Sequence, residues 1–352
     1  LVFTKRVKRL LVTTTILYLI PIMIFSVSFN ENNLYIYYLI IGAIVYFNYY
    51  IVWLANVINK PIEKMINNNF KRKAIRKLKE MTNLKVVGIT GSYGKTSSKN
   101  ILNDILNVKY NSFPTPKNFN TPVGLIITIN NYLDKFNDIF IAEMGAFKRG
   151  EIKELCDLVH PTYGILTTIG TAHLDSFGSR ENIQKGKFEL IESLPPDGIG
   201  ILNADDPYQV SYPLKNKVKI VWIGIDKDAD VKASNIKLSS DGTTFDVTFK
   251  GSTKKYQFET KLLGKANVYN ILAGIALGYH LGISIPKLIM GVKKVKPVEH
   301  RLELKKMGSI NIIDDAYNSN PVGSKMALDV LKLMPGKKII VTPGMIEMGS
   351  EE

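Results

Sequence analysis

Residues 86–97 read Val-Val-Gly-Ile-Thr-Gly-Ser-Tyr-Gly-Lys-Thr-Ser. Residues that favour a strand lead into a glycine-rich turn, and Gly-Lys-Thr then opens a helical pattern. This order surrounds an anion with backbone N–H groups, while Lys95 can reach the outer phosphates of a nucleotide and the hydroxyl of Thr96 can bind Mg²⁺. The usual motif has glycine at position 89, where this chain has Ile89. We therefore interpret the stretch as a variant nucleotide-binding loop.

Downstream of this loop, short apolar runs alternate with helical patterns, which predicts an α/β fold with a parallel sheet wrapped by helices. The expected strands are 85–90, 138–143, 162–168, 199–203 and 218–223. The expected helices are 95–107, 120–131, 149–159, 180–193 and 205–212. In residues 229–263, apolar and polar residues instead alternate one by one between turn-forming pairs, which predicts an antiparallel insert. A helix over 265–281 is expected to follow.

Residues 296–299 read as a linker to a second α/β region. There the pattern predicts a strand at 311–314, a helix at 322–333 and a strand at 338–341, the start of an incomplete, Rossmann-like C-terminal domain. The predicted domains are a transmembrane hairpin (1–58), a basic juxtamembrane helix (59–83), a central P-loop domain (84–296) and the C-terminal domain (297–352). We interpret the chain as a fragment that is trimmed at one or both ends.

The first 57 residues contain two apolar stretches, 10–29 and 34–57, each long enough to cross a hydrocarbon core. Only residues 30–33 separate them, so we expect a tight hairpin. Lysines and arginines flank both stretches, and the positive-inside rule then places the flanks and the following domains in the cytoplasm of a multi-pass membrane protein. A cleaved signal peptide is the alternative for the first stretch, but it lacks an Ala-x-Ala-like processing site and a second stretch follows.

Residues 61–81 carry apolar side chains at helical spacing, with basic residues on the other face. Either this helix lies on the anionic headgroups of membrane lipid or it packs on the next domain. Much of the net charge of +15 belongs to this first part of the chain, which indicates a membrane surface and not a nucleic acid as its partner. A single cysteine, Cys156, excludes an intrachain disulfide, and no Cys/His spacing typical of a zinc site occurs.

Further short runs follow the loop in a defined order. They are 118–124 (Asn-Phe-Asn-Thr-Pro-Val-Gly), 142–145 (Ala-Glu-Met-Gly), 170–174 (Gly-Thr-Ala-His-Leu), 185–189 (Lys-Gly-Lys-Phe-Glu), 203–206 (Asn-Ala-Asp-Asp), 264–268 (Gly-Lys-Ala-Asn-Val), 300–303 (His-Arg-Leu-Glu) and 314–321 (Asp-Asp-Ala-Tyr-Asn-Ser-Asn-Pro). As a set they resemble the Mur ligases, ATP-dependent amide ligases of peptidoglycan precursor synthesis, over residues 85–349. The last run resembles the members that add D-alanyl-D-alanine to a muramoyl tripeptide.

The resemblance implies an enzyme that uses ATP and Mg²⁺ to convert a carboxylate into an acyl phosphate, which an amine then attacks. It implies that nucleotide is bound by Gly91, Ser92, Gly94, Lys95, Thr96, Ser97, Asn267, Arg301 and Asp315. At position 266 this chain has alanine where the relatives often have histidine. The implied substrate residues are Asn118, Asn120, Thr121, Asn318 and Asn320, of which the last two also suit a turn before Pro321.

The implied catalytic residues are Lys95, Glu143, His173 and Lys187. The resemblance places Thr96 on one Mg²⁺ and Glu143, His173 and Lys187 on a second. Because Mg²⁺ prefers oxygen ligands, Lys187 is implied to react with CO₂ and bind as a carbamate, with Lys185 as the competitor for this role. The ordinary alternatives are a solvated carboxylate for Glu143, a hydrogen-bonded imidazole for His173 and a helix-surface lysine for Lys187.

The predicted membrane hairpin occupies the place where the family normally has a domain that binds the UDP end of its substrate. One hypothesis is therefore that a lipid-linked acceptor replaces the UDP-linked one. The leading hypothesis is a ligase that adds D-alanyl-D-alanine to a peptidoglycan peptide precursor. The alternatives are a membrane-anchored ligase of another polymer, such as poly-γ-glutamate, and a non-catalytic nucleotide-binding partner of wall synthesis. The expected partners are a cell-wall peptide precursor, an amino acid or dipeptide amine and membrane lipid, without nucleic acid.

Overall fold

The computed structural model describes residues 3–27, 34–317 and 321–342. It divides into two compact units, the N-terminal unit (residues 1–74) and the main unit (residues 75–352). The predicted hairpin turn at 30–33 and the predicted substrate residues Asn318 and Asn320 lie outside the described residues.

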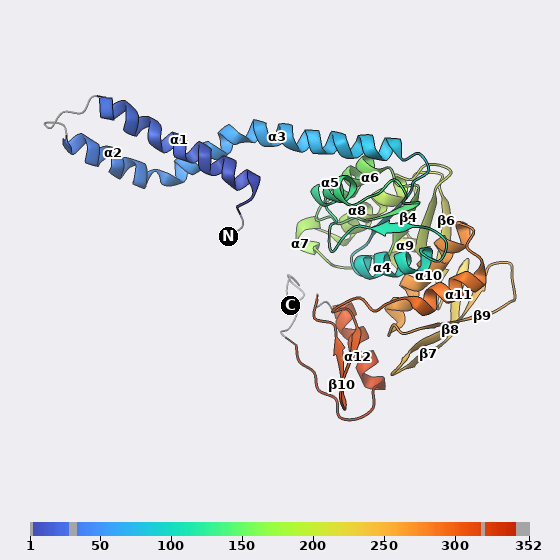
Figure 1. The fold of residues 1–352 in the computed structure, drawn as a ribbon. Helices are drawn as coiled ribbons and strands as arrows, with labels where there is room; N and C mark the ends of the chain where they lie inside the picture. Colours follow the sequence, from blue (N-terminus) through green and yellow to red (C-terminus); the bar gives the residue numbers. More distant parts are fainter. Residues whose placement is uncertain (1–2, 28–33, 318–320, 343–352) are drawn as a thin grey trace. The chain divides into compact units, whose positions relative to one another are not determined.

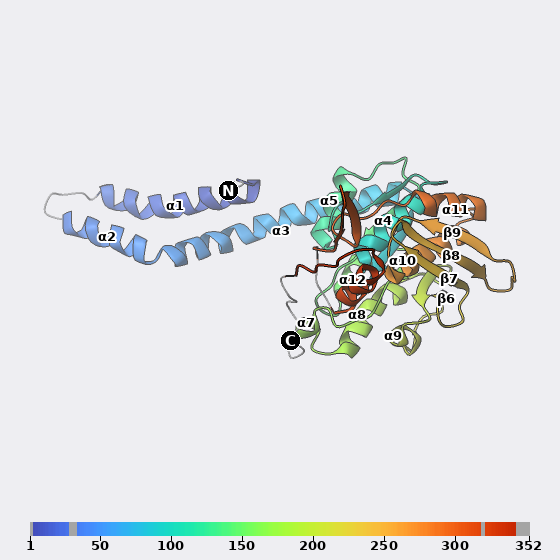
Figure 2. The same cartoon turned by 90° about the horizontal axis from the view of Figure 1, so that it is seen from below.

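The N-terminal unit is built from helices. They are α1 (Lys5–Val27), α2 (Leu34–Tyr46) and the first part of α3 (Asn48–Glu80). Polar contacts join α1 to α3: Arg9 Nη2 lies 2.7 Å from Glu63 Oε1, and one turn further on Asn59 Nδ2 donates to Thr13 Oγ1 at 3.0 Å. The later residue of α1, Thr13, contacts the earlier residue of α3, Asn59, so the two helices run antiparallel to each other (Figure 2).

Among the described residues, α1 is long and apolar enough from Lys5 to Ile24 to cross a membrane, with a mean hydropathy of 1.7. The second predicted stretch is not one straight helix, because the chain bends by 67° between Tyr38–Tyr46 and Asn48–Glu80, and only this bent pair together passes the same test. Helix α3 then continues through Pro61 to Glu80. The predicted boundary between hairpin and basic helix therefore falls inside a continuous helix.

Within the described part of the main unit, nine strands form one sheet in the order β2-β3-β1-β4-β5-β6-β7-β8-β9 (Figure 1). The strands are β1 (Lys85–Thr90), β2 (Ser112–Pro114), β3 (Ile139–Glu143), β4 (Tyr163–Leu166), β5 (Ile199–Asn203), β6 (Lys219–Gly224), β7 (Val231–Ser239), β8 (Gly242–Phe249) and β9 (Tyr256–Thr260). Pairing is parallel from β2 to β7 and antiparallel from β7 to β9. The predicted α/β class and the antiparallel insert are confirmed.

Helices cover both faces of the parallel strands. They are α4 (Lys95–Leu106), α5 (Pro122–Asn131), α6 (Glu151–Val159), α7 (Leu174–Phe177), α8 (Arg180–Glu192), α9 (Pro207–Val210), α10 (Lys265–His280) and α11 (Ile285–Lys294). Along β1, Val87 and Ile89 pack in one core with residues of α4 and α10, whereas Gly88 between them faces Leu190 of α8. Side chains alternate across a strand, so α4 and α10 lie on one face and α8 on the other.

The register of the parallel strands decides where the site lies. Ile89 of β1 stands opposite Glu143 of β3, and Thr90 stands opposite Leu166 of β4. These strands therefore end at one edge of the sheet, where the segments that follow β1, β3 and β4 meet.

The C-terminal part differs from the prediction. Residues 338–341 are not a strand. The chain instead forms an antiparallel pair, β10 (Glu303–Met307) with β11 (Ile310–Asp314), followed by α12 (Pro321–Leu333). A strand needs a neighbour to pair with, and Val341 is 94% exposed with no strand beside it among the described residues. Whether this hairpin and helix begin a Rossmann-like domain stays a prediction.

Candidate active site

The loop after β1 is shaped by two glycines. Gly91 has φ +149°, and a Cβ atom there would lie 2.0 Å from the Thr167 hydroxyl. Gly94 has φ +81°, a conformation in which L side chains are strained, and it begins α4. The Ser92 N–H donates to the Thr168 carbonyl at 2.7 Å. The loop is therefore fastened to the segment that follows β4, and its remaining N–H groups belong to the start of a helix, which suits an anion.

Lys95 is the first residue of α4, and its side chain folds back over the loop. Its Nζ donates to the carbonyl oxygens of Gly91 at 2.7 Å and Ser92 at 3.3 Å. Burial lowers the pKa of Lys95, the charge of Glu143 raises it and the charge of Arg301 lowers it. The predicted residue Ser97 lies in the same first turn and is half-buried.

Glu143 ends β3 and is 1% exposed. Its Oε1 accepts hydrogen bonds from Thr96 Oγ1 at 3.1 Å and from Asn120 Nδ2 at 3.3 Å. Its Oε2 lies 2.9 Å from Lys99 Nζ in an ion pair, without a well-directed hydrogen bond from the described residues. The structure thus brings together three predicted residues, Thr96, Glu143 and Asn120, and adds Lys99.

The hydroxyl of Thr96 and the carboxylate of Glu143 fit a magnesium ion. Both are oxygen donors, the ligands that Mg²⁺ prefers, and they lie side by side, with Thr96 Oγ1 3.1 Å from Glu143 Oε1. The amine of Lys187 does not fit as it stands, because an ammonium repels a cation and offers no lone pair.

Lys187, on α8, is buried: its Nζ donates to the Ala146 carbonyl at 3.3 Å and lies 5.3 Å from the centre of the Phe177 ring. Burial, and after it the charge of Lys95, lower the pKa of Lys187 to about 7. The competitor Lys185 is exposed. A buried amine that loses its proton near neutral pH is the better candidate for reaction with CO₂.

His173 follows β4 in the left-handed region, with φ +62°. Its ring is 4.5 Å from that of Phe147. Glu143, His173 and Lys187 therefore all border the segment 143–147: Glu143 begins it, Lys187 binds the carbonyl of Ala146 and His173 packs on Phe147.

The predicted substrate residues before α5 have different surroundings. Asn120 binds Glu143, as described above. The Thr121 hydroxyl accepts a hydrogen bond from the Gly124 N–H at 3.3 Å and so caps α5. Asn118 is exposed. This geometry assigns Thr121 a structural function and leaves Asn118 open to solvent.

Arg301 reaches the phosphate loop from the C-terminal segment. His300 and Leu302, on either side of it, both have positive φ angles of +60° and +48°. The Arg301 guanidinium lies 4.2 Å from the centre of the Tyr317 ring, and its Nη2 is 3.5 Å from Thr96 Oγ1. Strained backbone is often found at functional sites, and here it presents the arginine to Thr96.

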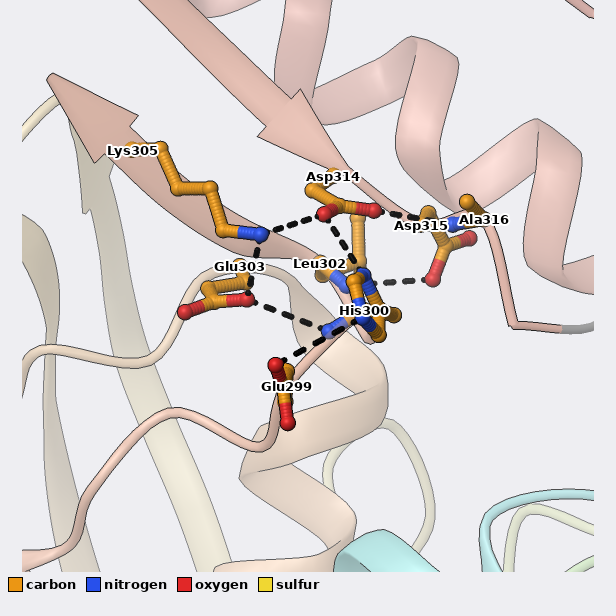
Figure 3. Close-up of polar contacts among 8 residues, drawn as sticks. All are labelled: Glu299, His300, Leu302, Glu303, Lys305, Asp314, Asp315 and Ala316. Carbon is orange, nitrogen blue, oxygen red and sulfur yellow. Dashed lines mark hydrogen bonds and ion pairs between the residues drawn. The ribbon is translucent and has the colours of Figure 1, made fainter. Parts of the chain in front are cut away.

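Hydrogen bonds around Arg301 hold this twisted backbone (Figure 3). Asp315 Oδ1 accepts from the Leu302 N–H at 3.0 Å, and burial raises the pKa of Asp315. His300 Nδ1 and Lys305 Nζ lie 2.8 Å and 2.5 Å from Asp314 Oδ2. His300, Asp314 and Glu303 are close enough to hold a metal ion, but the Lys305 ammonium occupies this cluster, which is therefore an ion-pair network.

Lys305 and then His300 lower the pKa of Asp314 to about 2. The Asp314 carboxylate consequently stays charged over the physiological pH range and keeps its contact with both partners.

The nucleotide-binding residue predicted on α10, Asn267, makes a hydrogen bond within the chain. Asn267 Nδ2 donates to the Leu263 carbonyl at 2.8 Å and secures the start of the helix. Asn270, which the prediction omits, faces the phosphate loop: a Cβ built on Gly94 would lie 3.5 Å from its Oδ1. Helical spacing could have identified the two residues that the prediction omits. Asn270 lies three residues after Asn267, and Lys99 lies four residues after Lys95, so each lies on the same side of its helix as a predicted residue.

The model of the Mur ligase middle domain matches residues 89–278, more than half of the chain. The chain belongs to the Mur ligase family. The UDP-N-acetylmuramoyl-tripeptide–D-alanyl-D-alanine ligase of Bacillus subtilis is 35% identical over 272 residues, which cover 76% of this chain and 58% of the relative. The enzyme of the same name from Escherichia coli is 32% identical over 270 residues, 76% of this chain and 59% of the relative.

Solved structures show the same fold for this Mur ligase. A crystal structure of MurF from Acinetobacter baumannii superposes with a TM-score of 0.71 at 27% identity, covering 77% of this chain and 59% of that one. MurF from Thermotoga maritima in complex with ADP gives 0.71 at 28% identity, covering 77% and 62%. The chain thus spans about three fifths of the length of these relatives.

Proposed function

We propose that this Mur ligase uses ATP to join D-alanyl-D-alanine to the peptide of a peptidoglycan precursor. The names of the Bacillus subtilis and Escherichia coli relatives support the reaction, and the ADP complex of the Thermotoga maritima enzyme supports nucleotide binding, which we assign to the phosphate loop.

One observation carries the proposal: Thr96, Lys99 and Asn120 converge on the buried Glu143. Two more cations lie nearby, since the charge of Glu143 raises the pKa of Lys95 and Arg301 contacts Thr96. Cations outnumber the single carboxylate, so the site attracts a polyanion such as the triphosphate of ATP. Phosphoryl transfer depends on this kind of positioning and charge neutralisation.

The chemistry we propose has two steps. A substrate carboxylate oxygen attacks the γ-phosphorus of ATP, ADP leaves and an acyl phosphate forms. The amine of the second substrate then attacks the acyl carbon, and inorganic phosphate leaves with the formation of the amide. Lys95 would bind the outer phosphates, and Arg301 would neutralise charge that develops on them. When bound at Thr96 and Glu143, Mg²⁺ would neutralise further phosphate charge.

Lys187 is proposed to act as a carbamate. Its neutral amine would add to CO₂ and release a proton, which changes a cation into an anionic oxygen donor beside the segment 143–147. With Glu143 and His173 it would then complete a second magnesium site, as the family resemblance implies. Its burial and its pKa of about 7 support this assignment over exposed Lys185.

The N-terminal unit is proposed to anchor the enzyme in the cell membrane, with the main unit in the cytoplasm. The support is the apolar surface of α1, whose residues Ile16 and Leu19 are 50% and 47% exposed, and the basic residues that precede it. An anchored enzyme would meet a lipid-linked acceptor as readily as a UDP-linked one, so we include both as substrates to test.

The test measures phosphate release by the protein purified in detergent with ATP and Mg²⁺. UDP-muramoyl-tripeptide and D-alanyl-D-alanine are added together and each alone, and a lipid-linked tripeptide then replaces the UDP form. Release that needs both substrates and is lost in Lys95→Ala is the expected result. Release only with another acceptor and amine would overturn the proposed substrates, and no release with any pair would overturn the ligase activity.

A further inference from the structure

Lys99 lies one helical turn after Lys95 on α4, outside the sequence motifs, and the two chemical steps proposed above give it no individual role. Its side chain is 1% exposed. An ammonium group is costly to bury unless it is paired, so a lysine at this depth reflects a specific local requirement.

Two partners satisfy the Lys99 ammonium. Its Nζ lies 2.9 Å from Glu143 Oε2 and donates to the Lys117 carbonyl oxygen at 2.5 Å. Lys117 has φ +49°, a strained conformation for a residue with a side chain. Lys99 therefore ties the end of β3 to the loop that leads to Asn120.

The ion pair leaves the two oxygens of Glu143 in different situations. Oε2 is taken by Lys99, whereas Oε1 faces the hydroxyl of Thr96 and the amide of Asn120. The carboxylate is thus held at three points, from α4 twice and from the loop before α5 once. Only Oε1 points to the side of the proposed magnesium ligand Thr96.

We propose that Lys99 is a positioning residue that withholds Oε2 of the Glu143 carboxylate from Mg²⁺, so that Oε1 is the oxygen offered to the ion beside Thr96. Its positive charge also keeps the site from binding the ion too tightly. This inference rests on the proposed function, because it concerns the magnesium that accompanies ATP. A lysine that only stabilises the fold would affect unfolding and leave the magnesium requirement unchanged.

The experiment compares the parent protein in detergent with Lys99→Met, which keeps the length of the side chain and removes its charge. A fluorescent ATP analogue is held at a fixed low concentration, and Mg²⁺ is titrated to find the concentration for half-maximal binding. In Lys99→Met we expect this concentration to fall about tenfold, because a competing positive charge is removed and Oε2 is released. Lys99→Arg, which keeps the charge, should stay close to the parent value.

Lys109→Met is the matched control, since Lys109 also donates to a backbone carbonyl, that of Gly282 at 2.8 Å, but outside the site. It should lower the unfolding temperature without changing the magnesium requirement. An unchanged or raised requirement in Lys99→Met would overturn the inference. If that variant does not fold, Lys99→Gln, which keeps a donor without the charge, decides by the same criterion. Failure of the parent protein to bind the analogue at any Mg²⁺ concentration would instead overturn the proposed function.

Discussion

The Thr96 hydroxyl donates a hydrogen bond of 3.1 Å to Glu143 Oε1 and joins the first turn of α4 to the end of β3. The two residues are 47 positions apart in the chain, and they meet because β1 and β3 are parallel neighbours that end at one edge of the sheet. This contact places the two oxygen donors of the proposed magnesium site side by side.

Thr96→Val should weaken magnesium-dependent binding of ATP. The substitution keeps the shape of the side chain and removes the hydroxyl, a loss of about 1–3 kcal/mol when a polar partner is left unsatisfied, or roughly fivefold to 150-fold in affinity. Titration calorimetry with and without EDTA measures the effect, which should vanish without the metal. Thr96→Ser keeps the hydroxyl and is the control. Equal affinities of the Val variant and the parent would exclude a role for Thr96 at the metal.

Carbamylation of Lys187 should depend on pH. Because its pKa in the folded protein is about 7, the amine is mainly protonated below pH 7 and cannot attack CO₂, whereas above pH 7 it is mainly neutral. With ¹³C-bicarbonate, the carbamate signal in the ¹³C NMR spectrum should therefore grow between pH 6 and pH 8.

Two variants identify the lysine responsible. The signal should disappear in Lys187→Gln and persist in Lys185→Gln, since Lys185 is exposed. Loss of the signal in the Lys185 variant alone would reverse the assignment, and a parent protein without the signal at pH 8 would contradict carbamylation altogether.

Arg301→Lys should lower the affinity for ATP about tenfold. A lysine keeps the charge but loses both the planar contact with Tyr317, whose ring centre is 4.2 Å away, and the reach of the guanidinium to Thr96. Arginine and lysine are not interchangeable at a stacked site of this kind. Equilibrium binding of a fluorescent analogue provides the measurement. The exposed Arg149 offers a matched control, and equal losses in Arg149→Lys would show that the effect is not specific to position 301.

Ile105→Ala should destabilise the main unit by about 2–5 kcal/mol, the usual cost of removing a large buried side chain. Ile105 of α4 is fully buried and fills the space above Gly274 of α10, where an added Cβ would lie 2.6 Å from its Cδ1. Urea unfolding followed by tryptophan fluorescence measures the change. Ile310→Ala, at a position 63% exposed, should change stability by about 0.5 kcal/mol or less. Similar losses at both positions would contradict the packing described here.

The double substitution Ile16→Lys and Leu19→Lys should release the protein from membranes. Both side chains are about half exposed on α1, and charged residues are costly within a hydrocarbon core. Fractionation of cells by ultracentrifugation, followed by an alkaline wash, shows where the protein is found. Val210→Lys, on the surface of the main unit, is the control and should stay in the membrane fraction. A doubly substituted protein that also stays there would contradict the anchor.

The parts of the fold that depend on local pattern could be predicted well. The five parallel strands expected around the phosphate loop occur within a few residues of their predicted bounds, because apolar runs and helical periodicity are properties of neighbouring residues. Four short or weakly marked elements were missed: β2 has three residues and α7 has four, α11 follows a glycine turn after α10, and β10 is the antiparallel partner of β11. The predicted strand at 338–341 was wrong, because apolar composition alone does not provide a pairing partner.

The sequence by itself determined the nucleotide-binding loop, the α/β class and the family, since each depends on residue types in a given order along the chain. Only the tertiary structure decided that Lys99 pairs with Glu143, that Asn270 rather than Asn267 faces Gly94, and that Lys187 is buried while Lys185 is exposed. These relationships join segments that are distant in the chain. Their distances follow from strand register and helix packing, and no local pattern of residues encodes them directly.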